Sequence, residues 1–401
     1  MVLGSPSKWC SVGFDDATVH IIIPMAVTNE SLNVLGKYIS SYSLHRNKAT
    51  LPNDDIVDEA TSEFIINISS CGLVPVITIL GIIGNIMSFV VFLRQKKRDR
   101  TRVVLISLAI SDTMYLLITC VRKMSCVVSM FDEVIGRNWG VFMVPQWYII
   151  GITFARVTSV LTMVVAIERC FAVLFPLKVR AVVTRARALK LVIAIFIMVS
   201  VAMFPLTLCS YTRWTLDPMQ NTSVLYVTWT DFYIKNEGVM ENYINIALAT
   251  LLRITPCIVV LFCTTAVLAS LKRGQKFRKQ SSNMAKSGIL MEERRVTVML
   301  LAVTSVYVIC LVPGSVLVLM RRFVPSFSRN GRYNNMFLLL SSMNIVLECL
   351  NSALNFVIYM KTNRRFNIAF KKMFCSSCNE KTLRNEIHLL SNGTSATSYL
   401  D

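Results

Sequence analysis

One stretch, Met163-Val-Val-Ala-Ile-Glu-Arg-Cys-Phe-Ala-Val-Leu-Phe-Pro-Leu-Lys178, decides how the whole sequence is interpreted. A long apolar run stops at Glu168, and Arg169 follows directly. Placing either charge at the centre of a bilayer costs several kcal/mol, so we expect this pair at a membrane surface. Taken alone, the pair is either a functional switch or a simple interfacial cap of an ordinary helix.

The composition of the chain indicates a membrane protein with several spans. Of the 401 residues, 54% are hydrophobic and 16% are charged, far from the average of soluble proteins. Seven apolar runs are long enough to cross a bilayer. They cover residues 72–93, 103–128, 141–167, 188–209, 243–270, 296–320 and 336–360. The sequence therefore predicts an all-α fold, a bundle of seven transmembrane helices over residues 71–360.

The positive charges predict the orientation of the bundle. Between them, four segments hold 27 of the 42 Lys and Arg residues, and these segments are 94–102, 169–190, 272–295 and 361–401. Because positive loops face the cytoplasm, the segment 1–70 is expected outside the cell. Asn-x-Ser/Thr tripeptides at Asn29, Asn67 and Asn221 agree with this and are predicted glycosylation sites. The net charge of +19 is thus assigned to loops at the membrane, and no nucleic-acid partner is expected.

The region 361–378 predicts a short eighth helix on the membrane surface. Between Arg364 and Phe374 the apolar residues Phe366, Phe370, Met373 and Phe374 share one helical face, and basic residues occupy the other. Cys375 and Cys378 follow directly, so we predict S-palmitoylation there in preference to metal binding, because no nearby ligands complete a metal site. Residues 379–401 form a polar cytoplasmic tail.

Several short motifs together resemble the rhodopsin-like (class A) G-protein-coupled receptors. Glu168-Arg169-Cys170 stands at the end of the third span, where the class has Asp/Glu-Arg-Tyr. The other matching motifs are Gly84-Asn85, Leu108-Ala-Ile-Ser-Asp112, Pro256, Cys310-Leu-Val-Pro313 and Asn355-Phe-Val-Ile-Tyr359. Within the class, Asn351-Ser-Ala-Leu-Asn-Phe-Val-Ile-Tyr359 is similar to the variant of invertebrate FMRFamide-type neuropeptide receptors.

The resemblance implies a receptor in the plasma membrane that binds an extracellular ligand, here a neuropeptide, and activates a heterotrimeric G protein. Arrestin and membrane lipids are further implied partners. A chemosensory receptor for small molecules is a rival within the class. A secondary transporter is a rival of another class, disfavoured because no inverted repeat is visible. An enzyme is not expected, since His20, His45 and His388 all lie outside the bundle.

Alignment with the class gives Asp112 a set of polar neighbours. These are Asn85, Thr158, Asn351, Ser352 and Asn355. Such a cluster of oxygens suits a hydrated Na⁺, so we hypothesise that Na⁺ on Asp112 favours the resting state, and we expect no other cofactor. The alternative is a neutral, hydrogen-bonded aspartic acid. Thr158 and Arg169 are eleven residues apart, about three turns, so they share one helix face.

The predicted G-protein switch centres on Arg169. Glu293 lies where the class often has the acid that holds this arginine, so Arg169 is expected between Glu168 and Glu293, with Asn355 and Tyr359 completing the switch. The alternative is that Glu293 belongs to a solvated helix start.

The other charges within or near the spans predict a ligand pocket. They are Arg122, Lys123, Arg156, Arg253 and Glu348. Both signs of charge suit a peptide or an amino acid. The alternative is an internal salt bridge between Glu348 and one arginine, with Arg122 and Lys123 reaching toward lipid headgroups.

The chain also departs from the class. Residues 127–169 and 210–256 contain no cysteine, so the usual disulfide between the third span and the following outer loop cannot form. Possible substitutes involve Cys10, Cys71, Cys126 and Cys209. In addition, Leu311, Phe356 and Thr264 replace a tryptophan, a proline and a tyrosine of the class.

Overall fold

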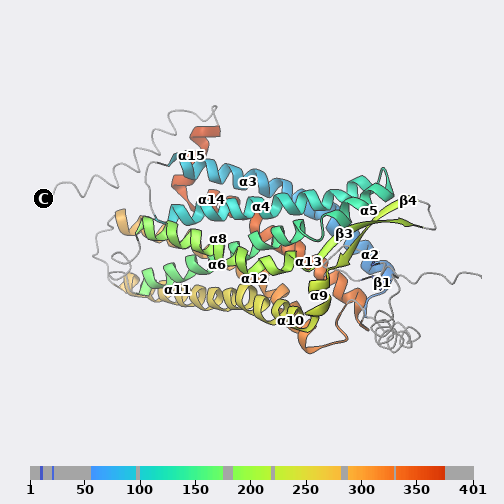
Figure 1. The fold of residues 1–401 in the computed structure, drawn as a ribbon. Coiled ribbons are helices and arrows are strands. Elements are labelled where there is room, and N and C mark those ends of the chain that lie inside the picture. Colours follow the sequence, from blue (N-terminus) through green and yellow to red (C-terminus); the bar gives the residue numbers. More distant parts are fainter. Residues whose placement is uncertain are drawn as a thin grey trace, which may run out of the picture.

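The structure is a computed structural model that describes residues 10–11, 20–21, 56–95, 100–174, 184–217, 222–280, 288–328 and 331–374. In these ranges the chain forms a bundle of long helices with a β-hairpin at one end (Figure 1). Seven helical stretches are long and apolar enough to cross a membrane, which confirms the predicted fold class. The end of the bundle that carries the hairpin is here called the hairpin end, and the opposite end the α15 end.

The spans combine α-helices with short π-helices, labelled η. The first is Glu59–Arg94 (α2, Glu59–Asn67; η1, Ile68–Leu73; α3, Val74–Arg94), and the second is Thr101–Ser129 within α4, Arg100–Ser129. The third is α6, Trp147–Leu174, and the fourth is α8, Arg185–Thr207. The fifth is Glu237–Arg273 (α10, Glu237–Asn242; η2, Tyr243–Leu248; η3, Thr250–Ile254; α11, Thr255–Gln280). The sixth is Val296–Phe323 within α12, Gly288–Phe323, and the seventh is Asn334–Thr362 (α13, Asn334–Ala353; α14, Asn355–Thr362). The other elements are β1 (Cys10–Ser11), β2 (His20–Ile21), α5 (Glu133–Phe142), β3 (Ser210–Asp217), β4 (Thr222–Trp229), α9 (Asp231–Lys235) and α15 (Arg364–Phe374).

Helix α6 is the central helix of the bundle. It contacts α4, α8, α11 and α12, and its Val157 and Leu161 are completely buried. By contrast, α8 exposes large apolar side chains such as Ile197, Val201 and Phe204. An exposed apolar face this extensive is suited to lipid, so α8 lies at the rim of the bundle.

Gly84 allows the first and seventh spans to approach closely. A Cβ atom built there would lie 2.9 Å from Cβ of Phe356, closer than real Cβ contacts come. Phe356, the residue in place of the family's proline, packs its ring against Phe366 and Phe370 of α15.

Several predicted helix boundaries are wrong. The third span begins at Trp147 instead of residue 141, which belongs to α5, and the fifth begins at Glu237 instead of residue 243. The first span begins at Glu59 instead of residue 72, because the side chain of Asp58 accepts a hydrogen bond from Thr61 N at 2.9 Å and so caps the helix. Helix α6 does not end at Glu168 and Arg169 but continues to Leu174. The first helix breaker after this pair in the sequence is Pro176, so the charges lie within a continuous helix.

The hairpin end is built from β3, β4 and α5. The two strands pair antiparallel from Ser210 opposite Trp229 to Asp217 opposite Thr222. Leu225 N donates to Oδ1 of Asn138 at 2.9 Å, and Leu225 also belongs to an apolar cluster with Val141 of α5. These contacts fix the hairpin over the ends of the helices.

A disulfide joins Cys71 of η1 to Cys126 of α4, with their Cα atoms 5.5 Å apart. It connects the first and second spans at the hairpin end, so a disulfide between two of the predicted substitute cysteines is present. Cys209 is a free, buried thiol. For Cys10, the structure describes the position of the backbone in β1 and not the side chain.

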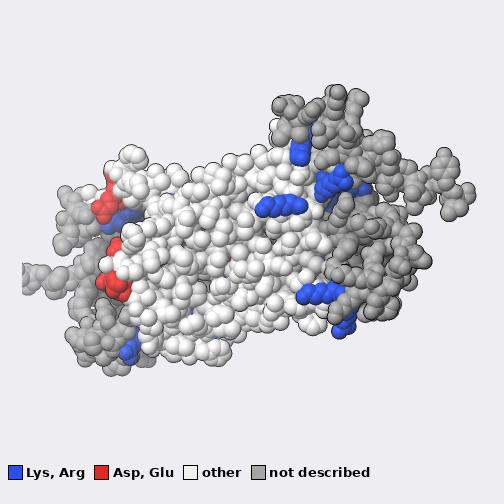
Figure 2. Space-filling view, turned by 180° about the vertical axis from the view of Figure 1, so that it is seen from behind, with Lys and Arg blue, Asp and Glu red and all other residues white. Residues whose placement is uncertain are grey.

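Helix α15 lies where the amphipathic eighth helix is predicted. Phe366 is completely buried, and its ring centroid is 5.1 Å from that of Phe92 and 5.6 Å from that of Tyr359. Cys375 and Cys378 lie outside the described residues. On the face drawn in Figure 2, Asp and Glu lie at the hairpin end, most Lys and Arg lie at the α15 end, and an uncharged band separates them.

Candidate functional site

A large pocket of about 440 Å³ lies at the hairpin end between the third, fifth, sixth and seventh spans. The lining includes Tyr148 and Ile152 of α6, Met203 of α8, Trp229 of β4 and Tyr233 of α9. The charged lining residues are Arg156, Arg253, Arg321, Arg322 and Glu241. A pocket of this volume with mixed apolar and polar walls is the usual form of a ligand site.

A small cavity of about 50 Å³ lies next to the large pocket. The two share Tyr148, Ile152, Arg156 and Arg253, so they are neighbouring parts of one site. Three guanidinium groups and one carboxylate line the small cavity, from Arg122, Arg156, Arg253 and Glu348. Its lining therefore carries a net positive charge.

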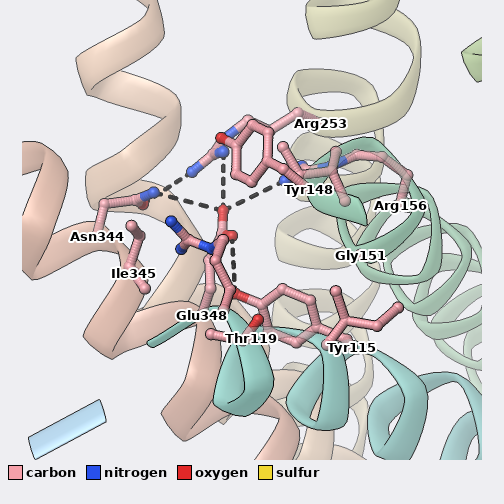
Figure 3. Close-up of a pocket in the computed structure, with 12 residues that line it drawn as sticks. Tyr115, Thr119, Tyr148, Gly151, Arg156, Arg253, Asn344, Ile345 and Glu348 are labelled. Carbon is pink, nitrogen blue, oxygen red and sulfur yellow. Dashed lines mark hydrogen bonds and ion pairs between the residues drawn. The ribbon is translucent and has the colours of Figure 1, made fainter. Parts of the chain in front are cut away.

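Glu348 of α13 is the centre of a buried polar cluster (Figure 3). Its Oε1 lies 2.8 Å from Arg253 Nη1 and 3.2 Å from Arg156 Nη2, and Asn344 Nδ2 donates to the same oxygen at 3.4 Å. Its Oε2 accepts a hydrogen bond from Tyr115 at 3.4 Å. The carboxylate thus ties four spans together, since Tyr115 belongs to α4, Arg156 to α6 and Arg253 to η3.

Both arginines keep polar atoms without a hydrogen bond to any described residue. These atoms are Arg156 Nη1 and Arg253 Nε, which are buried. The side chains of Arg156 and Arg253 are only 9% and 11% exposed. An unsatisfied buried donor on a charged group is costly.

The π-helical turns of the fifth span lie directly before Pro256. Proline has no backbone N–H and cannot continue the ordinary helical bonding behind it, so the preceding turns are irregular. Arg253 lies in the last of these turns, η3, and its Nη2 donates to Asn344 Oδ1 at 2.9 Å. Gly314 of α12 lies against this pair, because a Cβ built there would collide with both side chains.

Arg122 and Lys123 are buried, at 7% and 5% exposure, so they do not extend toward headgroups. The guanidinium of Arg122 lies 5.3 Å from the ring centroid of Tyr148, at the small cavity. Lys123 instead donates to Ser70 Oγ of η1 at 3.0 Å. Of the five charges predicted for the pocket, four therefore meet at the small cavity.

Asp112 is completely buried in a network of polar side chains. Its Oδ1 accepts a hydrogen bond from Thr158 at 2.9 Å, and its Oδ2 accepts one from Asn355 Nδ2 at 2.7 Å. Asn85 donates to the carbonyl of Ser352 at 2.9 Å, and Asn85 Oδ1 has no partner among the described residues. Asn351, which directly precedes Ser352 in the sequence, is also buried. The oxygens gathered here are of the kind that a hard cation prefers.

At the α15 end, the contacts of Arg169 include one within its own helix and one with α4. Its Nη2 lies 3.2 Å from Glu168 Oε1 and donates to Thr101 Oγ1 of α4 at 2.7 Å. The side chain of Glu293 lies outside the described residues, although its backbone belongs to α12. Tyr359 is buried, with its ring 5.2 Å from that of Phe92, and Thr264 donates to Thr304 at 3.1 Å.

The sequence prediction lacks many residues of these sites, among them the polar contacts Thr101, Tyr115 and Asn344. It also lacks the pocket-lining residues Tyr148, Arg321 and Arg322. Helical spacing from a predicted charged residue could have indicated Asn344 and Tyr115. Asn344 is four residues before Glu348 on the same face, and Tyr115 is three residues after Asp112.

The predicted glycosylation sites are placed only in part. Asn29 and Asn221 lie outside the described residues. Asn67 is exposed at the end of α2, and Ser69 of the same tripeptide is buried and hydrogen-bonded to Ile66 O.

Comparison with known proteins gives a family and several relatives. The family described as "7 transmembrane receptor (rhodopsin family)" matches residues 84–359. The FMRFamide receptor of Drosophila melanogaster is 24% identical over 313 residues, which cover 76% of this chain and 53% of the relative, so the chain spans about half of that receptor's length. Neuromedin-U receptor 2 of Mus musculus is 26% identical, covering 75% of this chain and 74% of the relative. The thyrotropin-releasing hormone receptor of Mus musculus is also 26% identical, covering 77% and 79%.

Proposed function

Since this chain belongs to the rhodopsin family of seven-transmembrane receptors, we propose that it binds an extracellular peptide and activates a heterotrimeric G protein. As a receptor of this family it is a multi-pass membrane protein and not an enzyme. Family membership also decides against the secondary transporter.

The large pocket is the observation that carries the proposed ligand. Its volume of about 440 Å³ exceeds what a single amino acid fills, and its walls offer aromatic side chains and both signs of charge. A peptide presents the same mixture of groups. The names of the relatives, which are receptors for FMRFamide, neuromedin-U and thyrotropin-releasing hormone, support this choice over a small odorant.

In the proposed orientation the hairpin end faces the outside of the cell and the α15 end faces the cytoplasm, with the plasma membrane as the location. The distribution of charge supports it, because on the face drawn in Figure 2 most Lys and Arg lie at the α15 end. The large pocket then opens toward extracellular ligand.

The proposed switch is the contact of Arg169 with Glu168 and Thr101, together with the predicted acid Glu293, Asn355 and Tyr359. In the proposed resting state, the contacts with Glu168 and Thr101 restrain the guanidinium. Na⁺ at Asp112 would favour the same resting state, with Asn85, Thr158, Asn351, Ser352 and Asn355 around it. Arrestin would bind the active α15 end in place of the G protein.

The experiment that tests the function is ligand-dependent nucleotide exchange. Membranes of cells that express the full chain with heterotrimeric G proteins are exposed to a panel of synthetic peptides, amino acids and odorants. We expect peptides to accelerate exchange in the wild type and not in Arg169→Ala at equal surface expression. Activation by odorants alone would replace the peptide with a small-molecule ligand, and no activation by any class would refute the proposal.

A further inference from the structure

We infer that the small cavity is a carboxylate-binding subsite, in which Arg156 and Arg253 hold an acidic group of the extracellular ligand. The inference rests on the proposed function and adds the chemical class of the ligand group that reaches deepest into the site.

The charge of the site supports an anionic ligand group. Among the described residues that line the small cavity, the charged ones are Glu348 and the three arginines Arg122, Arg156 and Arg253. Buried charges are costly unless they are paired, and one carboxylate cannot neutralise three guanidinium groups. The large pocket adds Arg321 and Arg322 against one acid, Glu241, so its charge has the same sign.

The hydrogen-bonding geometry supports a carboxylate in particular. Oε1 of Glu348 already accepts from Arg156 Nη2 and Arg253 Nη1, whereas Arg156 Nη1 and Arg253 Nε make no hydrogen bond to a described residue. Both donors are enclosed in the present side-chain conformations, so the guanidinium groups shift when these donors take up the two oxygens of a second carboxylate. The cavity of about 50 Å³ exceeds the roughly 10–15 Å³ that one water occupies, so a carboxylate fits.

The position of the cavity indicates how the rest of the ligand is placed. Tyr148, Ile152, Arg156 and Arg253 line both spaces, so a group in the small cavity continues directly into the large pocket. A ligand carboxylate would also compete with Glu348 for both arginines. Such competition loosens the tie between the third, fifth and seventh spans, next to α12 at Gly314.

The first test uses propionate as the probe on the purified full-length receptor. Thermal unfolding is measured with propionate or propionamide at constant chloride and ionic strength, because a ligand that binds the folded state raises the midpoint with the logarithm of its concentration above the Kd. We expect propionate alone to stabilise the wild type. Arg156→Gln and Arg253→Gln should weaken its apparent Kd by about tenfold or more, since a hydrogen bond to a charged group is worth roughly one decade in affinity.

Matched variants separate the subsite from general effects of charge or folding. Lys190→Gln removes an exposed cation of α8 and should leave the propionate response unchanged. Arg156→Lys retains the charge and should keep part of the propionate response. It tests this position if the glutamine variants fold poorly. Glu348→Gln removes the competing carboxylate and should bind propionate more tightly than the wild type. No stabilisation by propionate, equal stabilisation by propionamide or equal responses in all variants would overturn the inference.

The second test identifies the source of the carboxylate and keeps the two proposals distinguishable. Peptides are prepared in matched forms with a free or amidated C-terminus, and with Asp or Asn inside the sequence, and nucleotide exchange is measured. If peptides with a free C-terminus are more active, the terminal carboxylate is the group that binds in the small cavity. If peptides with Asp are more active, that group is a side-chain carboxylate. Active peptides that prefer neither acidic form would overturn the inference while leaving the peptide receptor intact. Stabilisation by propionate with no active peptide would refute the peptide receptor but not the subsite.

Discussion

Thr101 of α4 accepts a hydrogen bond from Arg169, the arginine of the proposed switch. Arg169 Nη2 lies 2.7 Å from its Oγ1. Thr101→Val keeps the shape and removes the oxygen, so the resting state loses a charge-assisted contact. We predict that basal nucleotide exchange rises about two- to tenfold. This factor corresponds to the loss of part of the free energy of one charge-assisted hydrogen bond in the resting state. Thr265→Val on the exposed face of α11 is the control, and unchanged basal exchange in Thr101→Val would contradict a restraining role.

Asp112 is the residue on which the sodium proposal depends. Its two oxygens accept hydrogen bonds from Thr158 and Asn355, and an amide in its place could keep the packing but not the charge. In the wild type we predict that replacing N-methylglucamine with Na⁺ at constant ionic strength weakens agonist potency, and that Asp112→Asn abolishes this difference. Asp231→Asn, at an exposed position of α9, should behave as the wild type. A neutral, hydrogen-bonded Asp112 would instead give no sodium effect in either protein.

Individual site residues could be foreseen where they carry charge. A charge inside an apolar run is costly, so Asp112, Arg156, Arg253 and Glu348 are conspicuous in the sequence. The partners Thr101, Tyr115 and Asn344 could not be chosen in this way, because hydroxyl and amide side chains are common in spans. Sequence also left open whether Glu348 forms salt bridges or lines a pocket, and the structure shows that it does both.

At the level of single helices, the approach of α12 to the polar cluster depends on Gly314. We predict that Gly314→Ala lowers the unfolding midpoint, since the new methyl group would collide with Arg253 and Asn344 and break their 2.9 Å hydrogen bond. Helix propensity alone would favour alanine by roughly 1 kcal/mol, so a loss must come from the collision. Gly238→Ala in α10, where a Cβ meets no atom within 4 Å, should be neutral or stabilising. Equal behaviour of the two variants in thermal unfolding would contradict this role.

The number of spans and the eighth helix follow from hydropathy and periodicity, whereas other elements could not be derived so directly. Helix α6 continues through a charged pair that hydropathy alone treats as an end. The π-helices before Pro256 have no periodic signal of their own. The hairpin was not predicted, although strand-forming residues such as Val224, Tyr226 and Val227 lie on one side of Pro218 and Asn221 and could have indicated it.

For the molecule as a whole, the disulfide between Cys71 and Cys126 closes a loop with a sequence separation of 55. Loop closure of this length is worth up to about 4 kcal/mol in unfolding free energy, and less where the spans stay inserted in the unfolded state. We predict that Cys71→Ser, Cys126→Ser and the double variant lose equal stability in thermal unfolding, because each removes the same bond. Cys120→Ser, at a free cysteine, should lose less. Additive losses in the double variant would show that the two residues do not act as a pair.

The attachment of the hairpin has a consequence for how long a ligand stays bound. Trp229 of β4 forms part of the wall of the large pocket, and the contacts of the hairpin include a hydrogen bond to Asn138, apolar packing on Val141 and stacking of Trp229 on Tyr233. Because these contacts are non-covalent, the hairpin can open locally at a lower free energy than global unfolding requires. If the hairpin covers the exit, its opening rate sets the residence time. Signalling would then end faster at higher temperature even when equilibrium affinity changes little.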